Sequence, residues 1–333
     1  MQTDKAPQKP NEAKARRGAP VKLIWLFVTI VLCAGGTAAL AVFVPVRSVG
    51  THLQNVFYSI PLYLLLAVGA GLCMARGYIN LSLPGTMSVS MMTFGLAYRG
   101  GMATLPAMLL ALLSGAAYGT LNGVFALQRR RNIQLVTALS SLLIGMAGTG
   151  FAAMISNLRN ISLDIENKAY MTAGTVFVLI ALGVCFLGAV GGKKLFRTET
   201  DGEPGVSGRN RFFWSVIAGM LAALAGIFLA IRNQRLHINI GSDSTYQVIL
   251  FFILVTAGIL IPNVRRTYTE ALFGLLAIPF AAFAFGTVDA LCAYLRLEAA
   301  VTYIIYAVAG LLLLIPNLLV CRRKKEDSAV KEN

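Results

Sequence analysis

Charged side chains are scarce in this sequence. Only 13% of the 333 residues are Asp, Glu, Lys or Arg, whereas 57% are hydrophobic. A soluble globular domain carries roughly 25% charged and 45–50% apolar residues. Each bilayer crossing by a helix requires about 20 predominantly apolar residues, for which this chain has ample material. The composition therefore excludes a soluble enzyme and predicts an all-α integral membrane protein.

Motifs for catalysis and metal binding are also missing. The sequence contains no GxSxG, no HExxH and no phosphate-binding GxxxxGK[ST], so the chain has no P-loop with which to hydrolyse ATP. Its five cysteines form no CxxC and no Cys/His cluster, so we expect no disulfide framework, metal site or cofactor. Of the 14 acidic residues, only Glu270 and Asp289 fall within apolar spans, which disfavours a transporter coupled to an ion gradient.

Apolar segments alternate with short polar connections along the chain. About ten such spans are expected, at residues 21–44, 54–75, 78–98, 103–127, 133–156, 170–191, 212–231, 245–262, 268–288 and 300–321. An even number places both termini on the same side. With the N-terminus in the cytoplasm, the 29 Lys and Arg residues divide roughly three to one in favour of that side, as the positive-inside rule requires.

The same charge distribution explains the net charge of +15, because the basic residues form short clusters between apolar runs. Nucleic-acid binding is therefore not expected. Residues 1–20 are polar and predicted to be a disordered cytoplasmic tail, 21–321 a single membrane domain, and 322–333 a basic cytoplasmic tail. The run at 21–44 is too long for a cleavable signal peptide and is expected to be the first membrane anchor of a multi-pass protein of the inner or plasma membrane.

The segment GYINLSLPG, residues 77–85, interrupts an apolar span with two glycines and a proline. A broken helix at membrane depth survives only where protein or a water-filled cavity satisfies the freed backbone groups, and such breaks often mark a substrate pathway. Asn80 and Ser82 supply polar side chains beside the break. The alternative is an ordinary proline kink with a satisfied asparagine, and the pattern alone leaves both open.

A second feature is the stripe formed by Gly115, Gly119 and Gly123. Small residues at every fourth position let two helices approach closely, so the stripe predicts helix packing. Asn122 on the same helix is expected to donate a hydrogen bond across helices.

Hydroxyl side chains mark the early turns of the next span. Thr137, Ser140 and Ser141 either face a polar cavity or bond back to carbonyl groups one turn earlier, and the sequence does not decide between these.

The motifs GYINLSLPGTMSVSMM, GTLNGVFALQ and QLVTALSSLLIG resemble the permease subunits of ABC importers, in the branch that serves ribose-type sugars, nucleosides and branched-chain amino acids. Asn80 to Ser82 match the opening of that family's substrate-facing helix, although Pro84 stands where nucleoside-type permeases usually carry Glu. Leu121 to Gly123 match its LNG motif, and Thr137 matches a common threonine. The resemblance covers roughly residues 55–320.

The resemblance implies a translocation subunit without enzymatic activity, which moves a small polar solute by alternating access. A sugar or nucleoside is favoured over a branched-chain amino acid. The implied partners are separate ATPase subunits, a second permease subunit (the same chain or a different one), an extracytoplasmic substrate-binding protein and the lipid bilayer. The implied substrate-pathway residues are Asn80, Ser82, Gly85, Asn122, Thr137 and Ser140.

The cytoplasmic loop at 192–211 departs from the family. The family carries there an Ala-rich short helix that docks on the ATPase, whereas this chain reads TETDGEPG, which is too rich in Gly and Pro for a good helix. Either the docking surface has diverged or this chain is the weaker partner of a heterodimeric pair. The remaining alternatives are a self-sufficient transporter or channel and a scaffold that no longer transports. The residues expected in ATPase coupling are Arg197, Thr200, Gly202 and Pro204.

Overall fold

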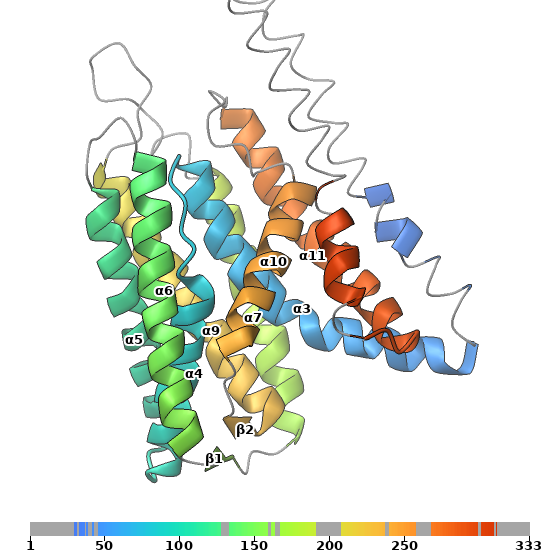
Figure 1. Ribbon diagram of the computed structural model, residues 1–333, viewed down its shortest axis with the longest axis horizontal. Coiled ribbons are helices and arrows are strands. Elements are labelled where there is room, and N and C mark those ends of the chain that lie inside the picture. The colour runs from blue at the N-terminus through green and yellow to red at the C-terminus, as the bar shows by residue number, and fades with distance from the viewer. Residues whose placement is uncertain are drawn as a thin grey trace, which may run out of the picture.

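The fold is a bundle of long helices (Figure 1). The computed structural model describes residues 46–127, 133–158, 161–163, 167–190, 208–236, 240–257, 268–298 and 301–309, with isolated positions between 30 and 42 and at 311. Its helices are α3 Val46–Ala75, α4 Leu83–Arg99, α5 Thr104–Ala126, α6 Ile133–Leu158, α7 Asn167–Val190, α9 Gly208–Asn233, α10 Ile240–Thr256 and α11 Tyr268–Tyr294.

Several of these helices have the length and composition of membrane spans. Within the described residues, five segments qualify, at Val56–Ala75, Thr104–Ala126, Leu135–Ser156, Gly208–Asn233 and Gly274–Tyr294. Two shorter apolar helices, Thr172–Gly188 and Thr245–Thr256, accompany them. The predicted class, an all-α membrane protein, is confirmed. The total of ten spans and the side on which the termini lie remain predictions.

Helices α3 and α9 form the centre of the bundle. In the 18-residue apolar segment of each, 83% is buried inside the protein, against 22% for α5 and 33% for α6. Helix α9 packs against α3, α4 and α5, and α4 fits between α5, α6 and α9. The outer faces of α5, α6 and α7 present large apolar side chains such as Leu113, Leu143 and Leu187. Such faces suit contact with lipid or another membrane subunit.

The glycine stripe of α5 packs against a second glycine on α9. A Cβ atom added at Gly119 would lie 2.6 Å from the carbonyl oxygen of Ser215, and one at Gly219 would overlap the carbonyl oxygen of Gly115. Gly123 meets the ring of Phe212 in the same way. The predicted role of the stripe in close helix packing is confirmed.

Two connections at one end of the bundle are joined by a short β-ladder (Figure 1). Strand β1, Ile161–Ser162, pairs antiparallel with β2, Arg235–Leu236, and the Leu163 N–H donates to the Gln234 carbonyl at 2.8 Å. These strands lie between predicted spans, in the stretches 157–169 and 232–244, which ten spans with a cytoplasmic N-terminus would place outside. Their pairing agrees with a common side for the two connections.

Asp289 on α11 is held by two tyrosine hydroxyls. Tyr63 of α3 donates to one carboxylate oxygen at 3.5 Å, and Tyr306 from the helical stretch 301–309 donates to the other at 2.5 Å. Charged groups within apolar spans require such partners. This carboxylate therefore ties three helical segments together.

Replacing Gly219 with Ala should destabilise the protein, because the new methyl group would overlap backbone atoms that cannot move aside. The expected cost is about 2 kcal/mol or more, as for other overpacked contacts. Gly183→Ala on α7 is the matched control, since no atom lies within 4 Å of its added Cβ. Thermal unfolding in detergent should show a lower Tm for the first variant alone. Equal Tm values would mean that the α5–α9 contact yields easily.

Candidate functional site

The polar site begins where α3 ends, at a turn that requires glycine. Gly77 adopts φ +79°, in the left-handed region. Its N–H donates to the Met74 carbonyl at 3.0 Å, and the Tyr78 N–H reaches back to the Cys73 carbonyl at 3.4 Å. This pair of bonds is the Schellman motif, which satisfies the last carbonyl groups of a helix and usually has Gly in the left-handed position. The chain therefore leaves α3 in a fixed direction.

From this turn, residues 78–82 connect α3 to α4 within the depth of the bundle (Figure 1), as an extended stretch that ends where Ser82 turns into α4 with φ −81° and ψ −8°. Its N–H groups bond to hydroxyls on α6: Ile79 to Thr137 Oγ1 at 3.3 Å, and Leu81 to Ser141 Oγ at 2.9 Å. Two extended residues advance roughly 6.6 Å and four helical residues roughly 6 Å, so N–H groups two residues apart match hydroxyls one turn apart. The hydroxyls replace the missing backbone partners.

Ser141 bonds both to the neighbouring segment and back to a carbonyl group of its own helix. Its hydroxyl accepts from the extended stretch and donates to the Ala138 carbonyl at 3.1 Å, within its own helix. One hydroxyl supplies one donor and two acceptor positions, so these bonds do not compete. Ser140 bonds back to the Thr137 carbonyl at 3.3 Å and is only partly buried. The structure gives Ser140 no bond to the extended stretch, whereas Ser141, absent from the predicted pathway set, holds it.

Asn80 closes a turn just before α4. Its side-chain oxygen accepts from the Ser82 backbone N–H at 3.1 Å and from the Ser82 hydroxyl at 2.7 Å. This is an Asx turn, in which an asparagine side chain bonds to the backbone two residues further on, and it fixes the entry of Ser82, the N-cap residue, into α4. Asn122 of α5 donates to the Ser82 hydroxyl at 2.5 Å and to the Tyr118 carbonyl at 3.0 Å. The expected bond from Asn122 across helices is confirmed.

The break is shorter than the predicted 77–85. Residues 83–85 already belong to α4, and Pro84 lies in its first turn. Proline is favoured there because the first helical N–H groups have no intrahelical partner to lose. The kink interpretation, with proline as the breaking residue, is therefore wrong. The satisfied asparagine that it included is nevertheless present, because Asn80 is 2% exposed, its side-chain oxygen accepts from Ser82, and its amide nitrogen donates to Cys73 Sγ at 4.0 Å.

Gly85 lies at a contact between helices. A Cβ atom there would overlap the Gly145 carbonyl on α6, and one at Gly145 would lie 2.9 Å from the Ser82 Cα. Residues 137, 141 and 145 thus form one face of α6, spaced by single turns. The hydroxyls face the extended stretch, and Gly145 faces the junction of that stretch with α4, at Ser82 and Gly85.

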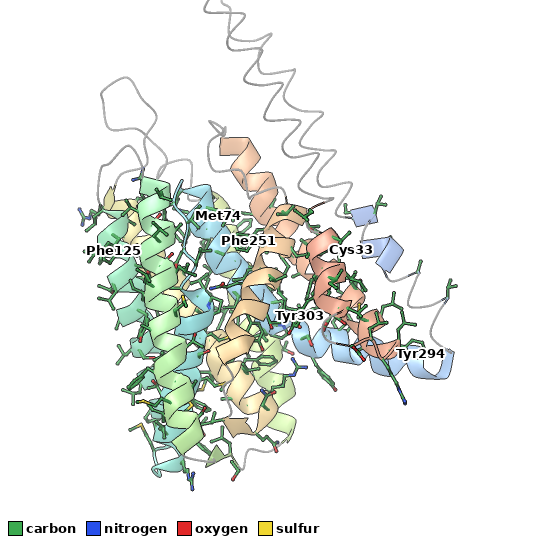
Figure 2. The ribbon with its side chains drawn as sticks, viewed as in Figure 1. Cys33, Met74, Phe125, Phe251, Tyr294 and Tyr303 are labelled. Atoms are coloured by element: carbon green, nitrogen blue, oxygen red, sulfur yellow. The ribbon has the colours of Figure 1, made fainter. Side chains whose placement is uncertain are left out.

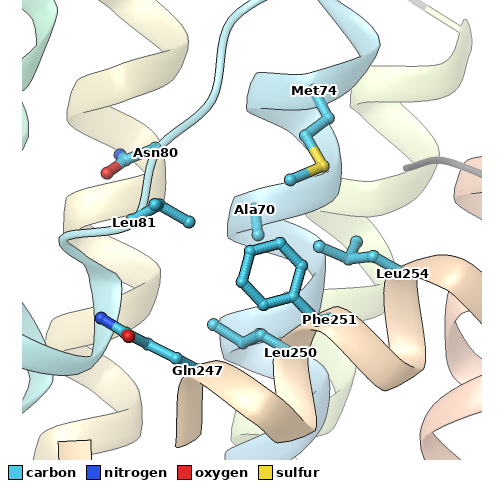
Figure 3. Close-up of a pocket in the computed structure, with 8 residues that line it drawn as sticks. All are labelled: Ala70, Met74, Asn80, Leu81, Gln247, Leu250, Phe251 and Leu254. Carbon is cyan, nitrogen blue, oxygen red and sulfur yellow. The ribbon is translucent and has the colours of Figure 1, made fainter. Parts of the chain in front are cut away.

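A cleft lies on the other side of the extended stretch, between α3 and α10 (Figure 3). Its cavity volume is about 10 Å³, room for about one water molecule, and its lining is mainly apolar. Figure 3 shows Leu81 directed towards Phe251, whereas the Asn80 amide lies on the opposite side of the stretch. Met74 from α3 and Phe251 from α10, labelled in Figure 2, both line the cleft. Its lining consists of Ala70, Met74, Asn80, Leu81, Gln247, Leu250, Phe251 and Leu254.

Gln247 provides the polar side-chain group on the α10 wall of this cleft, with its amide turned towards the extended stretch (Figure 3). None of the sequence motifs includes this residue. The available signal was a single amide at the start of the apolar run VILFFILV, residues 248–255.

The residues predicted to couple to an ATPase lie outside the described part of the chain. These are Arg197, Thr200, Gly202 and Pro204. Among the described residues, no three His, Cys, Asp or Glu side chains gather into a possible metal site.

The known proteins to which this chain is similar are import permeases, in agreement with the motifs. Over 287 residues the chain is 26% identical to the "Autoinducer 2 import system permease protein LsrC" of Yersinia enterocolitica, covering 79% of this chain and 77% of the relative. The protein of the same name from Enterobacter sp. (strain 638) is 27% identical over 190 residues, 54% of this chain and 55% of the relative. The resemblance to importer permeases is confirmed. No family model and no solved structure matches.

Ser141→Ala should destabilise the extended stretch, because the Leu81 N–H would be left without an acceptor in an apolar interior. An unsatisfied buried donor costs about 1–3 kcal/mol. Ser140→Ala removes the same atom from the neighbouring position without touching the stretch. Hydrogen exchange of a peptide covering residues 78–82 should accelerate in the first variant only. Unchanged exchange in both would show that the hydroxyl ladder does not hold the stretch.

Proposed function

We propose that this chain is the translocation subunit of an ATP-binding-cassette importer, moving a small polar solute across the inner membrane. The observation that carries the proposal is the extended stretch 78–82 at the depth of the helix bundle, next to a cleft. It coincides with the segment whose motif resembles the substrate-facing helix of such permeases. The import permeases to which the chain is similar support the same class.

The pathway is assigned to the cleft between the extended stretch and α10. Leu81 and Gln247 face it from opposite walls, and Phe251 closes one side (Figure 3). A mainly apolar lining with few polar groups is typical of small-molecule sites. Asn80, Ser82, Asn122 and Thr137 then shape the pathway by fixing the extended stretch, rather than by contacting the solute through their side chains.

Transport proceeds by alternating access, in which ATP binding and hydrolysis shift the population of inward-open and outward-open states. Since the chain carries no P-loop, ATPase subunits supply this energy from the cytoplasmic side. A second permease subunit completes the pore, and an extracytoplasmic binding protein delivers the solute. Both termini lie in the cytoplasm in this arrangement. A sugar or nucleoside is the proposed solute class, with autoinducer 2 as the first compound to test because the similar permeases carry its name.

Purification of the tagged chain from native membranes in mild detergent should recover a P-loop ATPase in near-equal amount. The complex in proteoliposomes should take up autoinducer 2, ribose or uridine when ATP is enclosed on the ATPase side. Leucine uptake instead would select the branched-chain amino acid alternative. Recovery of this chain alone, under conditions that preserve a known ABC complex, would contradict the proposal and favour a self-sufficient transporter or a protein that no longer transports.

Gln247→Leu should lower the rate of uptake about fivefold, the factor expected when one hydrogen bond to the solute is lost. The complex should still assemble, because leucine suits the apolar neighbours of this position. Thr120→Val on α5 is the control, since its hydroxyl donates to the Ala116 carbonyl in its own helix at 2.8 Å. Uptake equal to that of the unaltered complex would place the pathway elsewhere.

A further inference from the structure

Three helix ends meet around one buried arginine. Arg76 follows the last residue of α3 and is 1% exposed. Its guanidinium donates to the Leu72 carbonyl at 2.8 Å and to the Gly188 carbonyl at 3.4 Å, in the last turns of α3 and α7. Its central carbon lies 3.9 Å from the ring centre of Trp214, in the second turn of α9. A single side chain therefore contacts the ends of three helices.

These contacts hold the Arg76 guanidinium in one position. The C-terminal ends of helices carry partial negative charge, so two of them stabilise the buried cation. The Trp ring adds a cation–π contact. The planar guanidinium reaches two carbonyls and a ring at once, which a lysine ammonium on its flexible stem does not reproduce.

Tyr78 makes a second connection from the other side of Gly77. Its side chain is 1% exposed, and its hydroxyl donates to the Arg211 carbonyl in the first turn of α9 at 3.1 Å. Arg76 and Tyr78 thus join the start of the extended stretch to the end of α7 and to the start of α9. Those are the two helix ends that flank residues 191–207 in the sequence.

The extended stretch has no helical ladder of its own, so outside contacts set its position. Two of those contacts are the α6 hydroxyls of Thr137 and Ser141, and Arg76 and Tyr78 add contacts to α7 and α9. A shift of the α7 and α9 ends relative to α6 must therefore change how the stretch lies. Because Leu81 lines the cleft, such a shift reaches the cleft wall directly.

We propose that Arg76 and Tyr78 are positioning residues that transmit movement of the cytoplasmic ends of α7 and α9 to the extended stretch and its cleft. The proposal rests on the proposed function, because it assigns to these residues the step between ATP hydrolysis and solute movement. Neither residue needs to touch solute or nucleotide. Their loss should therefore uncouple the two activities rather than abolish either binding event.

The test measures autoinducer 2 transported per ATP hydrolysed, in proteoliposomes that hold the complete complex. Tyr78→Phe removes only the hydroxyl that reaches Arg211, so the complex should assemble and hydrolyse ATP while this ratio falls about fivefold, as for one lost hydrogen bond. Arg76→Lys keeps the charge but loses the bridging geometry, and its ratio should fall further. Tyr118→Phe is the control, since within the described part of the chain its hydroxyl makes no hydrogen bond.

The outcomes separate the two proposals. If the unaltered complex transports autoinducer 2 and both Tyr78→Phe and Arg76→Lys keep its ratio, the coupling role is wrong and the proposed function stands. If transport and ATP hydrolysis fall together in proportion in both variants, the residues are merely structural and the coupling role is again wrong. An unaltered complex that neither transports nor hydrolyses ATP would contradict the proposed function, and the coupling role would fall with it.

Discussion

Backbone groups that leave a helix at membrane depth must find hydrogen-bond partners inside the protein, and this constraint organises the centre of the molecule. In hydrocarbon, each backbone group left without a partner costs roughly several kcal/mol. Residues 78–82 meet the constraint through Thr137 and Ser141 of α6 and through Asn80, which accepts from the Ser82 N–H. The residue type at each turn of this α6 face therefore matches the segment opposite it: hydroxyls at Thr137 and Ser141 face the extended stretch.

The same constraint explains why neighbouring helices pack so closely. Side-chain hydroxyls are short, so α6 must lie near the stretch that it serves. Gly85 and Gly145 permit that approach where α4 begins. On the other side, α5 approaches α9 through the stripe that includes Gly119, while Asn122 in the same helix bonds to Ser82. Close packing and polar satisfaction thus support one another.

Much of this arrangement could be predicted from residue types. The break before Leu83, the packing stripe of α5 and the bond from Asn122 across helices all follow from small residues and amides in apolar spans. The choice between Ser140 and Ser141 could not be made, because it depends on the rotation of α6 about its axis. The end of the break was misplaced since proline suits a first helical turn as well as a kink. Gln247 was not predicted because the extended stretch that it faces across the cleft lies far from it in the sequence.

The β1–β2 ladder gives the bundle a fixed point at one end. It ties the connection after α6 to the one after α9, while the other end of α9 holds Trp214 and Arg211 against the turn at Gly77. Helix α9 has 26 residues, and at 1.5 Å per residue its length is roughly 39 Å. A rotation of about 5° around the ladder would move the far end by about 3 Å, by the same geometry. Under the proposed coupling role, a small rotation of α9 about the β-ladder is thus amplified at the contacts beside the extended stretch.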